Sequence, residues 1–209
     1  MTDLDRWLGS DRHPALLVSE CQNGLINPEH ATTMAGLAQQ AEERNIVGKI
    51  AALADAFRAA DLPVAHATIE PAEGYEGFDV ASPLAAVTVK RGEFRAGTPL
   101  PDIHPGLTPQ AGDLRFPRRT AMTSFFRSGL GAALRERGVD TVVLVGISVN
   151  IAIPGTAVEA VNRGLPVVIP EDATAATTAE VQEVTFRTIL PALATITTSQ
   201  DVIEAIARR

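Results

Sequence analysis

The chain has 209 residues, which suits one domain, and its hydrophobic fraction of 45% is enough for a sizeable core. Aromatic residues make up only 4%, so the core must consist mainly of alanine, valine, leucine and isoleucine. The formal net charge of −7 argues against a general nucleic-acid binder or a membrane-surface binder.

Segments that direct a protein to a membrane or out of the cell are not evident. The N-terminal stretch lacks a basic segment followed by an apolar one, and no apolar run approaches the roughly 20 residues of a spanning helix. Cys21 is the single cysteine, so no intrachain disulfide can form, and a reducing compartment fits. We therefore expect a cytoplasmic protein.

The first half of the chain predicts two strands and one helix before a long connection. Residues 15–19 (ALLVS) form an apolar run that predicts a central strand ending at Glu20, and residues 63–69 predict a second strand. Between them, apolar residues recur at helical spacing and predict an amphipathic helix: Ile46, Ile50, Leu53 and Phe57. Residues 71–109 are rich in Gly and Pro without clear periodicity, which is typical of a functional lid or an oligomer contact.

Predicted strands and helices alternate along the second half of the chain. Strands are predicted at 113–116, 141–145, 166–169 and 194–197, and helices at 128–137, 154–163, 179–190 and 201–208. This alternation predicts an α/β fold with a doubly wound, parallel sheet. No linker or repeat interrupts it, so we expect residues 1–209 to form one domain.

The predicted strand ends should meet at one edge of the sheet, where ligands bind in this class of fold. That edge would gather residues 20–22, 68–70, 118–125 and 146–152. Residues 141–156 (TVVLVGISVNIAIPGT) read as a buried strand that breaks at Gly146 and resumes as a helix. Free backbone N–H groups in such a loop can bind an anion or a developing oxyanion.

Two kinds of charged residue are candidates for chemistry at this edge. Burial at a strand end raises the pKa of a carboxyl group, so Glu20 is a candidate for proton transfer, although a structural carboxylate is an equal alternative. Of Arg118 and Arg119, we expect one to face the pocket and the other to face solvent. Side chains alternate along a strand, so Cys21 should be a buried and inert thiol.

The histidines do not indicate a metal centre. None of the four has the spacing of metal ligands: His13, His30, His66 and His104. We therefore expect neither a metal nor a cofactor.

Three segments resemble the isochorismatase-like (cysteine hydrolase) superfamily. ALLVSECQNGL is similar to the family's first-strand motif, an apolar run followed by Asp, any residue and Gln. RTAMTSFFRSGLGAALRERGVDTVVLVG resembles its Lys, three residues, Ser-Ala-Phe, helix and strand, and TSFFRSGL resembles the isochorismatases proper. GISVNIAIPGTAVEAVNRGLPVVIPEDATAA is similar to the segment around the nucleophile. The resemblance implies a three-layer fold, a six-stranded, mainly parallel, Rossmann-like sheet with helices on both faces, and homodimers or homotetramers.

The family's amidohydrolases use an Asp, a Lys and a Cys, and this chain departs from all three. The resemblance places Glu20 at the Asp position, Arg119 at the Lys position and Ala152 at the Cys position. Ala152 has no nucleophilic atom, which excludes a covalent acyl-enzyme there. The family's cis peptide, which supplies an oxyanion hole, would fall at Ile147–Ser148. The resemblance also suggests substrate contacts around this centre: Gln22, Phe125, Ile147, Ser148 and Ile151.

Three hypotheses follow. In the first, the protein hydrolyses a small carboxylate or amide metabolite without a cysteine nucleophile, as the isochorismatases proper do, with Glu20 as the acid and Arg119 as electrostatic support. In the second, it is a degenerate member that binds a small molecule or a partner protein without turnover. In the third, the nucleophile has moved to Cys21 or Ser148. A saturated pair of Glu20 and Arg119 that leaves no room for a ligand would exclude the first.

Overall fold

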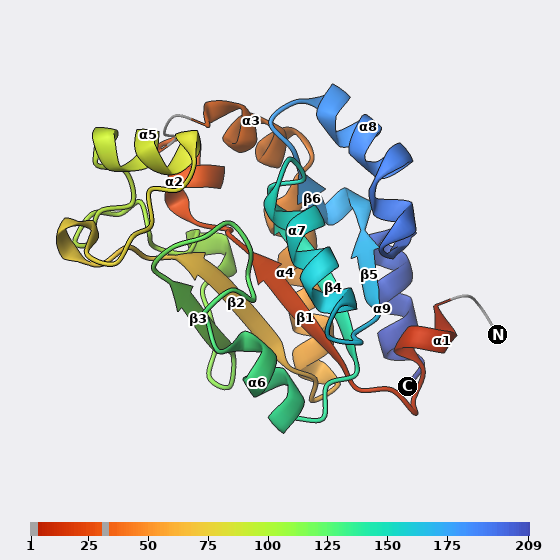
Figure 1. Cartoon of the computed structure of the whole chain (residues 1–209). Helices are drawn as coiled ribbons and strands as arrows, with labels where there is room; N and C mark the ends of the chain where they lie inside the picture. The colour runs from red at the N-terminus through yellow and green to blue at the C-terminus, as the bar shows by residue number, and fades with distance from the viewer. Residues whose placement is uncertain (1–3, 31–33) are drawn as a thin grey trace.

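The computed structural model describes residues 4–30 and 34–209, and its centre is one parallel sheet (Figure 1). The path across the sheet is β3-β2-β1-β4-β5-β7, and β6 pairs with β4 beside this path. The strands have the following bounds: β1 (Pro14–Ser19), β2 (Val64–Ile69), β3 (Leu114–Arg118), β4 (Thr141–Ile147), β5 (Val167–Pro170), β6 (Thr174–Ala175) and β7 (Thr195–Thr197). The predicted α/β class and the parallel, doubly wound sheet are confirmed.

Helices cover both faces of this sheet and give three layers (Figure 1). The first face packs against helices α4 and α9 and the second against α6, α7 and α8. The helices in the described part of the chain are α1 (Asp5–Leu8), α2 (Asn23–Ile26), α3 (Ala35–Glu43), α4 (Ile46–Ala59), α5 (Pro83–Arg91), α6 (Leu130–Glu136), α7 (Ala152–Val161), α8 (Ala179–Thr188) and α9 (Ser199–Ala207). None of them is long and apolar enough to cross a bilayer.

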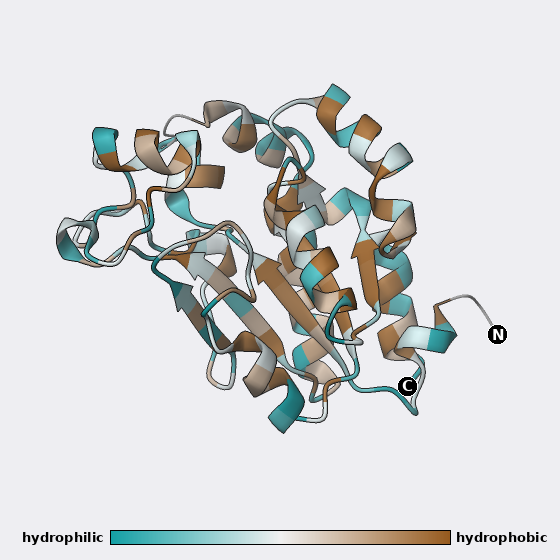
Figure 2. Cartoon of the chain, viewed as in Figure 1, coloured by the Kyte–Doolittle hydropathy of each residue, from teal (hydrophilic) through white to brown (hydrophobic). Residues whose placement is uncertain are grey.

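Burial on both faces explains why the sequences of the two central strands are almost entirely apolar. All residues of β1 and β4 are buried, and most of β1 is hydrophobic whereas the edge strand β3 is largely hydrophilic (Figure 2). Along β1, Leu16 and Val18 pack on the face of α4, while Ala15 and Leu17 pack on the face of α7. A strand buried on both faces needs apolar side chains at successive positions rather than at alternate ones.

The region 71–109 contains a helix that the sequence analysis did not predict. Helix α5 begins after Ser82, whose hydroxyl accepts a hydrogen bond from the N–H of Ala85, and Pro83 occupies its first turn. It ends at Gly92, which has a φ of +68°. Short helices α1 and α2, helix α3 and strand β6 were also not predicted.

Gly146 lets the two central strands approach closely at the edge where the site lies. Its φ is +98°, and a Cβ atom there would lie 2.3 Å from the carbonyl oxygen of Ser19 and 2.9 Å from Sγ of Cys21. Only glycine fits this close approach without strain. Because Gly146 pairs in register with Ser19, Glu20 after β1 and Ile147 at the end of β4 come to the same edge of the sheet.

Candidate active site

A cavity of about 420 Å³ opens at the carboxyl ends of the central strands. Its wall includes Glu20 after β1, Ile69 at the end of β2, Arg118 at the end of β3 and Ser148 after β4. Ala152, the first residue of α7, completes this end of the cavity. The strand ends that the sequence assigned to one edge therefore line one common space.

The charged centre of this cavity is an ion pair between Glu20 and Arg118. Nη2 of Arg118 donates to Oε1 of Glu20, and Nε donates to the carbonyl oxygen of Ala121 at 3.3 Å. Arg118 is 2% exposed and Glu20 7% exposed. Nη1 of Arg118 is buried and has no hydrogen-bond partner among the described residues. The pair is thus held by one contact and leaves one guanidinium nitrogen unused.

This geometry corrects the assignment of Arg119. Side chains alternate along β3, so consecutive arginines point in opposite directions. Arg118 is buried against Glu20, whereas Arg119 is exposed and lines a separate, polar hollow that also includes Glu70 and Arg115. The basic residue opposite Glu20 is Arg118.

Glu20 combines an uncommon backbone conformation with a perturbed carboxyl group. Its φ is +54°, a region that side chains other than glycine rarely adopt, and such strain gathers at functional sites. Its N–H donates to the carbonyl oxygen of Ala67 at 2.8 Å, which holds the turn in place. Desolvation by burial raises the pKa of the carboxyl group, and the charge and hydrogen bond of Arg118 oppose this only in part. Glu20 therefore keeps a proton at a pH where an exposed glutamate has lost it.

The loop between β4 and α7 presents backbone groups to the same end of the cavity. The peptide bond between Ile147 and Ser148 is cis, at the place that the family resemblance implied. The N–H of Ala152 lies at the start of α7, where it has no acceptor within the helix. The side chain of Asn150 fixes the loop, since it accepts from the N–H of Thr177 at 2.9 Å and donates to Oγ1 of Thr177 at 2.8 Å.

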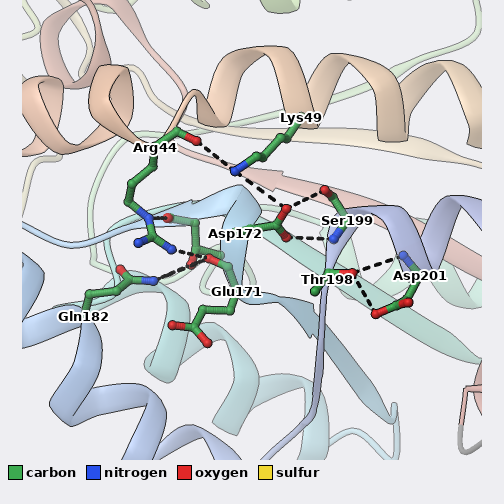
Figure 3. A network of polar contacts seen from close by, with 9 residues as sticks. Arg44, Lys49, Glu171, Asp172, Gln182, Thr198, Ser199 and Asp201 are labelled. Atoms are coloured by element: carbon green, nitrogen blue, oxygen red, sulfur yellow. Dashed lines mark hydrogen bonds and ion pairs between the residues drawn. The ribbon is translucent and has the colours of Figure 1, made fainter.

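A polar network behind β6 supports this loop (Figure 3). Arg44 donates to the carbonyl oxygens of Thr174 and Glu171, each at 2.9 Å. Asp172 accepts from the N–H and the hydroxyl of Ser199, at 2.7 and 2.6 Å. These contacts join α3, α9 and residues 171–174. Because β6 pairs with Gly146 and Ile147, the network holds the backbone that leads into the cis peptide.

Three of the predicted substrate contacts do not reach the cavity. The side chain of Gln22 is buried, donates to the carbonyl oxygens of Ile69 and Pro101, and accepts from the N–H of Ile69, so it fixes loops. Phe125 and Ile147 belong to the two faces of the core. Phe126, one residue further, lines the cavity instead of Phe125.

The other two predicted contacts, Ser148 and Ile151, do line the cavity. The sequence analysis missed the wall opposite them, which comes mainly from the region 71–109: Phe78, Leu84, Ala85, Thr88 and Phe94. A signal for this wall was present, because Ser82-Pro83 before an apolar stretch and Gly92 after it are the start and stop signals of a helix.

The thiol of Cys21 is poorly placed for chemistry. It is buried, it is absent from the cavity wall, and its Sγ lies 3.5 Å from the carbonyl oxygen of Ser19. Desolvation, reinforced by the charge of Glu20, raises the pKa of this thiol far above its ordinary value. Within residues 4–30 and 34–209, no group of three or more His, Cys, Asp or Glu side chains is arranged to hold a metal ion.

Comparisons with known proteins agree with this architecture. The sequence model of the Isochorismatase domain matches residues 14–201. An uncharacterised isochorismatase family protein of Escherichia coli O157:H7 is 28% identical over 197 residues, which cover 92% of this chain and 95% of that protein. The maleamate amidohydrolase of Pseudomonas putida is 27% identical over 162 residues, 78% of this chain and 72% of that enzyme. The crystal structure of an isochorismatase family protein from Desulfovibrio vulgaris has a TM-score of 0.79 at 26% identity and covers 95% of this chain and 100% of that chain.

Proposed function

Because this chain belongs to the isochorismatase family, we propose that it hydrolyses small amide or carboxylate metabolites without a cysteine nucleophile. The observation that carries the proposal is the carboxyl group of Glu20, which is buried, has a raised pKa and lines a cavity of about 420 Å³. The maleamate amidohydrolase of P. putida, a relative at 27% identity, supports amide hydrolysis as the reaction class.

The side chains at the cavity favour catalysis by proton transfer over covalent catalysis. Ala152 offers only a methyl group where the family resemblance puts the nucleophile. Cys21 lies outside the cavity and its thiol stays protonated, so it cannot replace that group. Ser148 lines the cavity, but no histidine lines the wall with it in the described part of the chain to act as its base. Water is then the attacking group.

Glu20 supplies both proton transfers in this scheme. As a carboxylate it takes one proton from a water molecule, whose oxygen attacks the carbonyl carbon of the amide while the C=O electron pair moves to oxygen. The protonated Glu20 then gives that proton to the amide nitrogen as the C–N bond breaks, which leaves a carboxylic acid and an amine. A carboxyl group whose pKa is raised by burial is better suited to both steps than an exposed one.

Arg118 and the start of α7 stabilise the negative charge that forms. In the first step Arg118 favours the ionised form of Glu20 through Nη2, since its charge and hydrogen bond oppose the rise in the pKa of that carboxyl group. Nη1 of Arg118, which has no partner among the described residues, and the N–H of Ala152 at the start of α7 are the donors for the oxygen that becomes negative. Hydrogen bonds of this kind lower the barrier most in a buried site.

A turnover screen of the purified protein tests the proposal. Small carboxamides and isochorismate-like vinyl ethers are offered to the natural protein and to Glu20→Gln. We expect turnover in at least one class, a loss of roughly 100-fold or more in Glu20→Gln, and unchanged ligand binding by that variant, which should remain folded. Unchanged turnover by Glu20→Gln would remove Glu20 from the mechanism. Ligand binding with silence in both classes would favour a family member that binds without turnover.

A further inference from the structure

The cavity also indicates what kind of substrate it accepts. Resting on the proposed function, we propose that the site selects a neutral, hydrocarbon-rich carboxamide with one anchored oxygen, and that it rejects dicarboxylates. Three properties of the cavity favour such a ligand: the distribution of polar and apolar groups on its wall, its charge and its volume.

The rest of the wall, beyond Glu20 and Arg118, is mainly hydrocarbon, although Ser82 and Thr88 add hydroxyl groups to it. Helix α5 contributes Leu84 and Ala85, and the region on either side of it contributes Phe78 and Phe94. Phe126 adds a third aromatic ring from the loop after β3. Apolar groups gain free energy when they leave water for such a surface, whereas a ligand's hydroxyl or carboxylate groups would lose hydration without a partner.

The charge of the wall argues against anions with two carboxylates. Three acids line the cavity: Glu20, Asp79 and Glu93. Arg118 is the one basic side chain on that wall within the described residues. The wall therefore carries no excess positive charge, whether Glu20 is protonated or ionised. A dicarboxylate would enter a buried space with at most one cation to pair with.

Arg118, which lines the cavity, is the polar anchor that we infer for such a ligand. Nη1 of Arg118 is buried and without a partner among the described residues, although Nη2 and Nε of the same guanidinium are both engaged. Leaving a buried N–H group unsatisfied is costly, so a ligand oxygen at this point is favoured. A single carbonyl oxygen satisfies it without adding charge.

The volume of the cavity limits the size of the hydrocarbon part of the ligand. A cavity of ~150 Å³ is enough to hold benzene, and this one measures about 420 Å³. It has room for an aromatic or alicyclic ring together with a short chain and the amide group. A two-carbon amide would leave most of the apolar wall uncovered.

Four commercial compounds test this selectivity: hydrocinnamamide, acetamide, hydrocinnamate and phenylsuccinate. Dissociation constants are measured calorimetrically on the full chain, and hydrolysis of the amides is followed separately. Hydrocinnamamide should bind roughly 100-fold or more tightly than acetamide because of its extra buried hydrocarbon. Phenylsuccinate should bind at least roughly 10-fold more weakly than hydrocinnamamide, with hydrocinnamate between them. Equal or tighter binding of phenylsuccinate would overturn the proposal.

A matched pair of variants locates the binding. Ala85→Leu narrows the cavity, whereas Ala86→Leu changes the next, exposed residue of α5, which is absent from the wall. We expect Ala85→Leu to weaken hydrocinnamamide roughly 10-fold or more, with little effect on acetamide, and Ala86→Leu to change neither. Equal effects of the two variants would contradict this site. Tight, selective binding of hydrocinnamamide without hydrolysis would support the ligand class and reject the proposed hydrolysis, so the two failures are distinguishable.

Discussion

The two ends of β3 each carry an acid–arginine pair, and the pairs differ in how many of their hydrogen bonds are satisfied. Asp113, just before the strand, has a side chain that is 3% exposed. Its Oδ1 accepts from Nε of Arg58 at 3.2 Å, and its Oδ2 accepts from Nη2 of Arg58 at 2.6 Å and from the N–H of Gln110 at 2.8 Å. Burial raises the pKa of Asp113, but the hydrogen bonds and charge of Arg58 outweigh it, so the net shift is downward.

At the other end of the strand, Arg118 holds Glu20 through Nη2 and leaves Nη1 without a partner in the described residues. Here desolvation outweighs the arginine, and the pKa of Glu20 is raised. The same two functional groups thus give a fixed carboxylate at one end and a carboxyl group ready to exchange a proton at the other. Saturation of the hydrogen bonds and access to a cavity separate a structural ion pair from a reactive one.

The largest effects on stability and ligand binding are expected when each arginine is removed in turn. Arg58→Met strands an ionised Asp113 and should lower the free energy of unfolding by roughly 3–5 kcal/mol. Arg118→Met should cost less, because Glu20 can take up a proton, but it should abolish ligand binding. Urea denaturation and calorimetric titration measure the two effects.

Arg119→Met is the control for this pair, because Arg119 is exposed beside Arg118. It should change the free energy of unfolding by no more than about 0.5 kcal/mol. A larger stability loss in Arg118→Met than in Arg58→Met would refute the contrast between the two ends of β3.

The pH dependence of stability should have opposite signs at the two ends. The folded pKa of Asp113 lies below its ordinary value of 3.8, so its contribution is present above that pH and is lost on further acidification. The folded pKa of Glu20 lies above 4.5, so its contribution is present below that pH and is lost as the pH rises. Relative to the natural protein, Glu20→Gln should gain stability as the pH rises above 4.5, and Asp113→Asn should not. Urea titrations across the pH range decide this, and parallel curves for the two variants would be inconsistent with it.

His66 lies beside Asp113 and should add its own pH dependence to the stability of the fold. Its Nε2 lies 3.5 Å from Oδ2 of Asp113, yet desolvation by burial outweighs this acid and lowers the pKa of the imidazole. The folded protein therefore disfavours the proton that the unfolded chain accepts below pH 6.5, and stability should fall as the pH decreases through that value. His66→Phe should flatten the stability curve between about pH 5 and pH 7. An unchanged slope in this variant would show that His66 does not contribute.

The smallest effect is expected at Cys21, the neighbour of Glu20. Its thiol is buried and its pKa is raised, so thiol alkylation of the native protein should be slow and should leave turnover largely intact. Mass spectrometry of the labelled protein, run beside an activity assay, measures both quantities. Complete inactivation by a reagent that labels Cys21 without unfolding would instead support a relocated nucleophile.

Much of the fold could be predicted because its signals are local. The central strands are buried on both faces, so their sequences are apolar throughout, and the segments between them have helical periodicity or helix stop signals. Glu20 could be placed at the site because it directly follows such a strand. Helix α5 is short and half-buried, so its periodicity is weak. Its capping residues Ser82 and Gly92 nevertheless indicate a helix between them.

The side-chain directions at the site could not be predicted in the same way. Arg118 and Arg119 are chemically identical, and only the register of β3 against β2, where Arg118 pairs with Ile69, decides which one turns inward. Phe125 and Phe126 lie in the loop after β3, where no periodic pattern tells which ring faces the cavity. Gln22 has a polar side chain at the correct edge, but backbone groups of two loops use up its hydrogen bonds.

The most direct test of the account compares turnover of one substrate by Glu20→Gln and Asp113→Asn. Both variants replace a buried carboxyl group by an amide of nearly the same shape. We predict that Glu20→Gln loses roughly 100-fold or more in kcat and keeps its fold, whereas Asp113→Asn keeps its kcat and loses stability. Equal activity of Glu20→Gln and the natural protein, or a larger loss of kcat in Asp113→Asn, would contradict the account.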